Sequence, residues 1–222
     1  MTQQLSRNVT IEPEHAAILF VDVQTYNCTR DGGEYAGLGS QEMEQRYGWF
    51  FRTLQDSALP NMRRLQRACR EAAIEVTYTV IESQTTDGRD RSLDYKISHL
   101  HVPKGSPDAR MPPELTPDGD EIIFPKTSSS VFISTNIDYV LRNLGVKYLI
   151  IAGCLTDQCV DSAVRDACDL GYLVTVPTDA CVTLSAERHE SSLRNNSGYC
   201  RQCTTRELLD EIARVSERRR LL

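Results

Sequence analysis

The 222-residue sequence has little positive charge, and this limits the partners that it can attract. Its 25 Lys and Arg residues are outnumbered by 31 Asp and Glu residues, so the formal net charge is −6. Only the short stretch Arg218–Arg220 is locally basic. Because phosphate backbones and anionic lipids attract basic surfaces, we expect neither nucleic acid nor a membrane as a partner.

Long apolar runs are also missing from the sequence. Met1–Glu14 is mostly polar, unlike a signal peptide, and the longest apolar runs, Ala16–Val21 and Tyr148–Ala152, are much shorter than the roughly 20 residues that span a bilayer. We therefore expect the protein to be cytoplasmic. The length allows one well-buried core and is short for two, which predicts a single domain over residues 1–222.

The eight cysteines do not form the compact pattern of a disulfide framework. They are spread over a full-sized domain and nothing directs the chain to an oxidising compartment, so we expect reduced thiols. Cys200 and Cys203 have the spacing of half a zinc site, but no second pair accompanies them. Cys69, Cys168 and Cys181 are expected to act as small buried hydrophobic residues.

Short β-branched apolar runs alternate with helical patterns along the chain, which is typical of an α/β fold with a mostly parallel sheet between helices. Strands are predicted at Ala16–Asp22, Glu75–Ile81, Glu121–Phe124, Lys147–Ala152 and Leu173–Pro177, with a short one near Gly198–Gln202. Helices are predicted at Asn61–Ala73, Asn136–Leu144, Gln158–Leu170, Ala186–Asn195 and Thr205–Val215.

Several helix boundaries have a local cause. Gly145 and Gly171 each follow the last residue of an apolar periodicity, where helices often end at a glycine. Thr204, with Glu207 three residues later, predicts a capping box at the start of the last helix.

Two connections are too long for a short-loop α/β pattern. Cys28–Ser57 and Gln84–Pro117 are expected to be binding loops, lids or subunit contacts. The first contains the aromatic group Tyr47, Trp49, Phe50 and Phe51, which we expect to pack between subunits because aromatic residues concentrate in interface cores.

Three reactive side chains follow predicted strands, at the sheet edge where open parallel sheets bind ligands. Asp22 closes the first strand, Lys126 follows the third, and Cys159 begins the helix after the fourth. Taken singly, each has an ordinary explanation: a capping carboxylate, a solvated lysine, a small buried cysteine. Together they predict a catalytic site.

The three residues fit the steps of acyl transfer. A helix N-terminus and a nearby ammonium both favour the thiolate of Cys159. Lys126 would also hold charge that develops on a carbonyl oxygen, while Asp22 would take the thiol proton and pass it to a leaving amine. The turn Gly153–Gln158 is expected to aim the backbone N–H groups of Leu155 and Cys159 at one oxyanion.

The sequence resembles the isochorismatase-like cysteine hydrolases. The resemblance lies in three motifs in the family's order, together with segments between and after them that extend it from about Ala16 to the last helix. The motifs are Phe20–Gln24, Pro125–Phe132 and Ala152–Val160, and the further segments are Ser162–Ala167, Leu170–Tyr172 and Asp179–Cys181.

This resemblance implies a Rossmann-like three-layer α/β/α fold and an Asp22, Lys126, Cys159 triad. It also implies a cis peptide between Cys154 and Leu155, a homodimer or homotetramer, and no cofactor. The metal-binding Asp and paired histidines of nicotinamidases are replaced here by Glu82–Asp87, so no catalytic metal is expected.

The departures from nicotinamidases, together with the presence of Cys159, favour the branch that hydrolyses carbamoyl and ureido compounds such as biuret, triuret, ureidoacrylate and N-carbamoylsarcosine. Such small polar substrates need directed hydrogen bonds. The expected substrate contacts are Gln24, Tyr26, Asn27, Arg91, Tyr95, Lys96 and Gln158.

Amide hydrolysis through a thioester on Cys159 is thus the leading hypothesis. The alternatives are isochorismatase-type vinyl-ether hydrolysis, in which Asp22 and Lys126 act without the cysteine, and a binding protein of the same fold that has lost the reaction.

Overall fold

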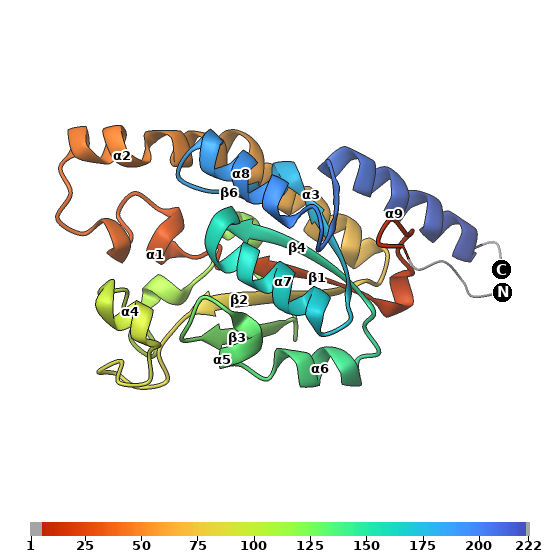
Figure 1. The fold of residues 1–222 in the computed structure, drawn as a ribbon, viewed down its shortest axis with the longest axis horizontal. Coiled ribbons are helices and arrows are strands. Elements are labelled where there is room, and N and C mark those ends of the chain that lie inside the picture. Colours follow the sequence, from red (N-terminus) through yellow and green to blue (C-terminus); the bar gives the residue numbers. More distant parts are fainter. Residues whose placement is uncertain (1–5, 221–222) are drawn as a thin grey trace.

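The computed structural model describes residues 6–220, which are organised around a seven-stranded sheet (Figure 1). Six strands follow the order β3-β2-β1-β4-β5-β7, β6 pairs with β4, and every pairing is parallel. The strands are β1 Ala16–Val21, β2 Glu75–Ile81, β3 Ile122–Lys126, β4 Tyr148–Cys154, β5 Leu173–Pro177, β6 Cys181–Val182 and β7 Arg201–Cys203.

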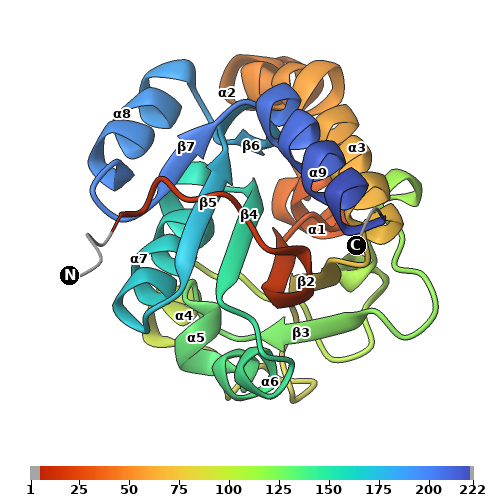
Figure 2. The same ribbon diagram turned by 90° about the vertical axis from the view of Figure 1, so that its right-hand side faces the viewer.

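Helices cover both faces of the sheet, with α3 and α9 on one side and α6 and α7 on the other (Figure 2). This confirms the expected three-layer α/β/α fold. The helices are α1 Thr25–Cys28, α2 Ser40–Thr53, α3 Leu59–Glu71, α4 Leu93–Ile97, α5 Val131–Ser134, α6 Ile137–Asn143, α7 Asp161–Asp169, α8 Ala186–Asn196 and α9 Thr205–Arg220. Within residues 6–220, no helix combines the length and apolar character needed to cross a membrane.

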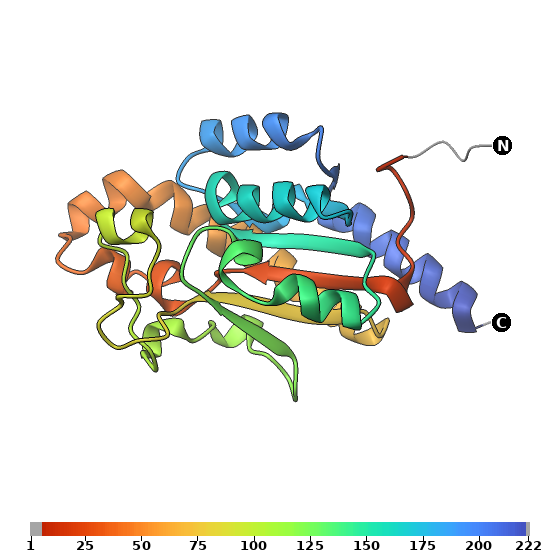
Figure 3. The ribbon, with the colours of Figure 1, turned by 60° about the horizontal axis from the view of Figure 1, so that its bottom comes forward.

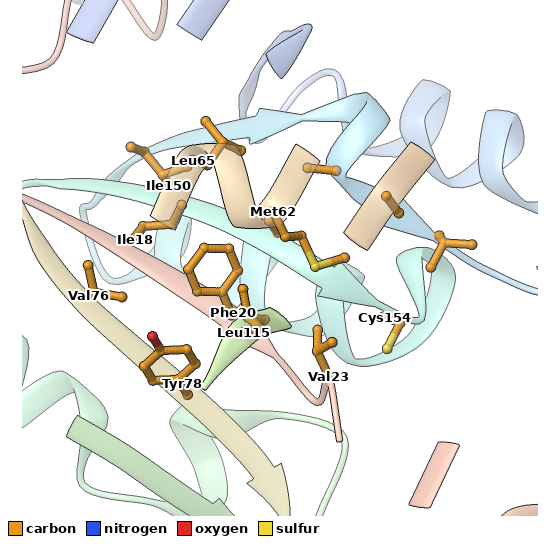
Figure 4. Packing of buried hydrophobic residues seen from close by; sticks show 14 of the residues in the cluster. Ile18, Phe20, Val23, Met62, Leu65, Val76, Tyr78, Leu115, Ile150 and Cys154 are labelled. Carbon is orange, nitrogen blue, oxygen red and sulfur yellow. The ribbon is translucent and has the colours of Figure 1, made fainter. Parts of the chain in front are cut away.

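The strand β1 is buried along its whole length because both of its faces meet helices. Ile18 and Phe20 join the core beneath α2, α3 and α9, while Leu19 points into the core beneath α6 and α7. The Phe20 ring stacks on that of Tyr78 at 5.6 Å between centroids, close to Met62 of α3 (Figure 4). Each such side chain contributes about 1.5–3 kcal/mol by leaving water.

The local signals for helix ends are confirmed. Gly145 and Gly171 follow α6 and α7 with positive φ values of 73° and 94°. At the start of α9, Thr204 N–H donates to Glu207 Oε2 at 2.7 Å and Glu207 N–H donates to Thr204 Oγ1 at 3.3 Å, which is the expected capping box.

The expectation of a long loop over Cys28–Ser57 is wrong. Helix α2 covers much of this segment and continues through a π-helical turn at Leu54–Ala58 directly into α3. Gly39 stands at the start of α2 and Gly48 lies inside it, so local helix propensity is weak and the packing of one face into the hydrophobic core, against Tyr35, decides the conformation.

The aromatic group of α2 belongs mainly to the core of the chain itself, which corrects its assignment to subunit packing. Phe50 and Phe51 are fully buried, and their rings meet edge to face at 5.2 Å between centroids. Tyr47 and Trp49 are half-buried against the same core.

Two strands also differ from expectation. Strand β3 extends to Lys126, so this lysine ends the strand rather than following it. Strand β6, only two residues long, carries too little pattern to be seen in the sequence. In the segment Gln84–Pro117 the one α-helix is the five-residue α4, which lies with α1 at the carboxyl ends of the central strands (Figure 3).

The burial of α2 predicts a stability effect that does not depend on assembly. Replacing Phe51 by Ala should lower the free energy of unfolding by about 3–5 kcal/mol, because it empties a packed site. Chemical denaturation at two protein concentrations measures this, with Tyr139→Ala, at a 71% exposed site on α6, as the control expected to change stability by about 0.5 kcal/mol or less. If the loss of unfolding free energy varied with protein concentration, Phe51 would lie in a subunit interface instead.

Candidate active site

The chain turns sharply at Asp22, directly after β1, where φ is 53°. Asp tolerates this left-handed conformation better than most residues do. The Asp22 N–H donates to the carbonyl of Thr79 on β2 at 3.1 Å, and Thr79 Oγ1 donates to Asp22 Oδ1 at 2.6 Å. The neighbouring strand therefore fixes the buried carboxylate and leaves its second oxygen, Oδ2, for other contacts.

Lys126, the last residue of β3, is completely buried at the centre of the site. Its Nζ lies 2.8 Å from Asp22 Oδ2 and 3.4 Å from Cys159 Sγ. It also donates to Tyr95 Oη at 2.9 Å and to the carbonyl of Ser128 at 2.8 Å. The three hydrogens of the ammonium are therefore shared among four neighbours.

The Lys126 ammonium stays charged in this environment. Burial by itself would lower the pKa of Lys126, but the charges of Asp22 and Cys159 outweigh it and hold this pKa well above its ordinary value. Asp22 Oδ2 lies against this ammonium at 2.8 Å, whereas Oδ1 is held by Thr79. Oδ2 is thus the carboxylate oxygen that faces the reactive side chains.

Cys159 lies in a π-helical turn, Thr156–Val160, that leads into α7, and it is 7% exposed. Its Sγ is 3.8 Å from Tyr95 Oη. Burial is the main influence on the pKa of the Cys159 thiol and raises it, the nearby Lys126 lowers it, and Asp22 raises it. The resulting pKa is about 12. The expectation of a preformed thiolate is therefore wrong, since desolvation and the carboxylate outweigh the ammonium.

Sheet order brings the three residues together. The strands stand as β3-β2-β1-β4, and the side chain of Lys126 reaches from the end of β3 across β2 to Asp22. On the other side, Gly153 of β4 approaches β1 so closely that a Cβ there would lie 2.3 Å from the carbonyl oxygen of Val21. This contact places the turn with Cys159 beside the end of β1.

The peptide bond between Cys154 and Leu155 is cis. Cys154 Sγ donates to the Asp22 carbonyl at 3.3 Å, which ties the end of β4 to the turn after β1. Leu155 and Cys159 both border the cavity described next. Their predicted role as oxyanion donors stays a prediction.

A cavity of about 490 Å³ opens onto Asp22 and Cys159 at the carboxyl ends of the strands. Larger hollows of about 730 Å³ beside the β3 edge and about 910 Å³ over α3 contain none of the three reactive residues. The smaller cavity is therefore the candidate active site. Its lining consists of Asp22, Tyr26, Asn27, Glu34, Ile81, Asp94, Tyr95, Ser98, Leu100, Ser129, Cys154, Leu155, Gln158 and Cys159.

Four of the expected substrate contacts border this cavity: Tyr26, Asn27, Tyr95 and Gln158. Tyr95 also contacts a reactive residue directly, because its hydroxyl accepts a hydrogen bond from Lys126. Burial, followed by the charge of Glu34, raises the pKa of Tyr26 to about 12, so Tyr26 presents a neutral hydroxyl.

The other three expected contacts lie elsewhere. Gln24 is fully buried. Its Oε1 accepts from the Ile81 N–H at 2.6 Å, and its Nε2 donates to the Ile81 carbonyl at 3.0 Å. Arg91 donates to backbone carbonyls of its own loop, including that of Leu100 at 2.8 Å. Lys96 is exposed outside the cavity lining. The contacts of Gln24 and Arg91 serve loop structure, which a polar residue type alone did not reveal.

Several wall residues were not anticipated, notably the acidic pair Glu34 and Asp94. Glu34 belongs to a single 3₁₀ turn, Gly33–Tyr35, between α1 and α2. Although the residue is exposed, the carboxyl sits in concave surroundings, and this desolvation raises the pKa of Glu34 to about 7. Neither acidic residue had a motif or strand-end position that could have identified it. Among the described residues, no group of three or more His, Cys, Asp or Glu side chains could hold a metal ion.

Comparisons with known proteins find related sequences and folds. The profile of the Isochorismatase domain matches residues 16–207. The ureidoacrylate amidohydrolase RutB of Rhizobium rhizogenes (strain K84) is 28% identical over 188 residues, which covers 78% of this chain and 72% of that protein.

Two solved structures share the fold. A cysteine hydrolase from Pseudomonas syringae pv. phaseolicola 1448A superposes with a TM-score of 0.80 at 23% identity, over 97% of this chain and 100% of the other. N-carbamoylsarcosine amidase from Thermoplasma acidophilum superposes with a TM-score of 0.65 at 20% identity, over 86% and 96% of the two chains.

The electrostatics of the site predict how Cys159 reacts with iodoacetamide. With a pKa of about 12, roughly one thiol in 10⁵ is ionised at pH 7, so alkylation of the free protein should be slow and rise about tenfold per pH unit between pH 7 and 10. Asp22→Asn removes a charge that raises this pKa, and alkylation at pH 7 should accelerate about tenfold or more. Mass spectrometry of the Cys159 peptide measures the rate, with circular dichroism to verify folding. Slower alkylation in Asp22→Asn would contradict the assigned electrostatics.

Tyr95→Phe tests whether this hydroxyl positions the ammonium. The Tyr95 hydroxyl lowers the pKa of Cys159 and accepts from Lys126, so its removal should slow alkylation and reduce kcat about tenfold while KM changes little. If KM rose with kcat unchanged, Tyr95 would be a substrate contact alone.

Proposed function

This chain belongs to the isochorismatase family, and from that membership and the site geometry we propose that it is a cysteine-dependent amidohydrolase of small carbamoyl or ureido compounds. It is a hydrolase of an amide C–N bond that releases ammonia or an amine. The observation that carries the proposal is the buried ammonium of Lys126, 2.8 Å from Asp22 and 3.4 Å from Cys159, two residues that line a substrate-sized cavity.

The first half of the reaction forms a thioester. As Cys159 Sγ attacks the carbonyl carbon, its proton passes to Asp22 Oδ2, the carboxylate oxygen beside the Lys126 ammonium. Lys126 stabilises the sulfur as it loses its proton. The backbone N–H groups of Leu155 and Cys159 hold the carbonyl oxygen as it becomes an oxyanion.

The tetrahedral adduct then collapses. Asp22 returns the proton to the leaving nitrogen, the C–N bond breaks, and ammonia or an amine departs. Water next attacks the thioester while Asp22 accepts one of its protons. The C–S bond breaks, the proton returns to sulfur, and the free acid leaves with the enzyme restored.

The raised pKa of Cys159 fits this cycle, because a thiol that stays protonated until substrate arrives does not react with other electrophiles. Attack is coupled to proton transfer rather than preceded by ionisation. The buried Asp22 is then needed twice, as base and as acid.

The relatives support the substrate class. The name of RutB gives ureidoacrylate as its substrate, and N-carbamoylsarcosine also carries a carbamoyl nitrogen. The family name itself keeps vinyl-ether hydrolysis of isochorismate as a second candidate. The homodimer or homotetramer expected from the resemblance stays a prediction.

A substrate screen with nucleophile variants tests the proposal. Carbamoyl and ureido compounds, simple acyl amides and isochorismate are incubated with the protein and ammonia is measured. We expect ammonia from ureido substrates, and a loss of the order of 10³-fold or more in Cys159→Ala and Cys159→Ser. Intact mass spectrometry should detect an acyl adduct on the wild type alone.

Cys168→Ser is the matched control, since this half-buried thiol on α7 lies outside the cavity and its loss should leave turnover unchanged. Full ureido turnover in Cys159→Ala would end the thioester mechanism. Turnover of isochorismate alone would favour the ether hydrolase, and no turnover of any compound, with no adduct, would favour a binding protein.

A further inference from the structure

The walls of the cavity above the reactive residues carry negative charge without a matching cation. Beyond Asp22, two further carboxylates line it, Glu34 and Asp94. The described lining residues include no Lys, Arg or His, and the one ammonium beneath them, on Lys126, is already paired with Asp22. A substrate carboxylate would therefore find no partner here.

Glu34 and Asp94 come from separate elements. Glu34 lies on the turn Gly33–Tyr35 and Asp94 in the first turn of α4. Both residues are exposed. Within residues 6–218, neither side chain takes part in an ion pair or a hydrogen bond, although the surface pairs elsewhere show that arginines are plentiful. The two carboxyl groups are thus free to act on whatever enters, and Glu34 does so as an anion above its raised pKa of about 7.

Other features of the wall favour hydrogen-bond donors on the ligand. Asn27 is 6% exposed and borders the cavity, and its Oδ1 is a buried acceptor with no donor among the described residues. Glu34 exerts the largest of the charge effects on the neighbouring Tyr26, whose pKa it raises; Asp108 also raises this pKa, and Arg91, outside the lining, lowers it by less. An acceptor-rich, anionic wall complements N–H groups and cations and repels carboxylates.

We propose that Glu34, assisted by Asp94, selects amide or ureido substrates whose distal end is uncharged or cationic and excludes those that end in a carboxylate. This rests on the amidohydrolase function proposed above. Ureidoacrylate ends in a carboxylate, so this cavity would disfavour it. Neutral compounds rich in N–H groups, such as biuret, would fit the cavity better.

Two matched pairs of substrates separate charge from shape. N-(2-aminoethyl)urea is the cationic isostere of N-propylurea, and 3-ureidopropionate is the anionic isostere of N-(3-methylbutyl)urea. Ammonia release gives kcat/KM for each. Repulsion between like charges in a partly desolvated site lowers kcat/KM by roughly tenfold to a hundredfold relative to an uncharged ligand. We therefore expect kcat/KM for 3-ureidopropionate to be lower than that for its isostere by this factor.

Charge variants assign the effect to residues. Glu34→Gln should raise the ratio for 3-ureidopropionate over its isostere about tenfold, Glu34→Arg should raise it further, and Asp94→Asn should act in the same direction. Asp120→Asn removes one negative charge beside the start of β3, at the opposite end of the sheet, and should leave the ratio unchanged.

The outcomes distinguish a failure of charge selection from a failure of the amidohydrolase function. If the isosteres are hydrolysed but 3-ureidopropionate is handled equally well, and Glu34→Gln leaves the ratio as it was, the charge selection is wrong and the amidohydrolase function stands. If Asp120→Asn shifts the ratio as much as Glu34→Gln, net charge and not the cavity wall is responsible, which also overturns the assignment. If none of the four compounds is hydrolysed and Cys159 forms no adduct, the function proposed above has failed.

Discussion

The ammonium of Lys126 lies 2.8 Å from Asp22 Oδ2 with neither side chain open to solvent. Removing two such charges from water costs several kcal/mol per ion, and the cost is offset only where further partners complete the pair. Tyr95 and the Ser128 carbonyl do so for the ammonium, and Thr79 does so for the carboxylate. A pair of this kind contributes little net stability. Burial keeps the cysteine protonated, and the pair keeps both a base and a cation within reach of it.

The parallel sheet makes the pair possible. Strands buried on both faces end together at one edge, so Asp22 meets Lys126 and Cys159, both more than a hundred positions later in the sequence, without a long loop to carry them. The close approach of Gly153 to Val21 and the bond from Cys154 to the Asp22 carbonyl hold the turn of Cys159 in place. The helices on either face contribute packing, whereas α1, α4 and the turn Gly33–Tyr35 form the walls of the cavity.

Chemistry and selectivity are thus divided between different parts of the chain. The three reactive residues can serve any carbonyl with a nitrogen leaving group, and they stand on strand ends. The groups that line the outer cavity, such as Glu34 and Asp94, stand on short elements between strands, which tolerate change more readily. This division explains why family membership identifies the bond that is cleaved more readily than the molecule that contains it.

The alternation of apolar runs and helical patterns determined the sheet, most helix positions and the three reactive residues, because these depend on local periodicity and on where strands end. Local capping signals at Gly145, Gly171 and Thr204 were equally sufficient. Tertiary structure alone decided that α2 is a helix with a buried face, that Gln24 and Arg91 hold backbone in place, and that Glu34 borders the cavity. It also reversed the expected state of Cys159, since a pKa depends on the balance between burial and two opposite charges, and that balance exists only once distant segments have been packed together.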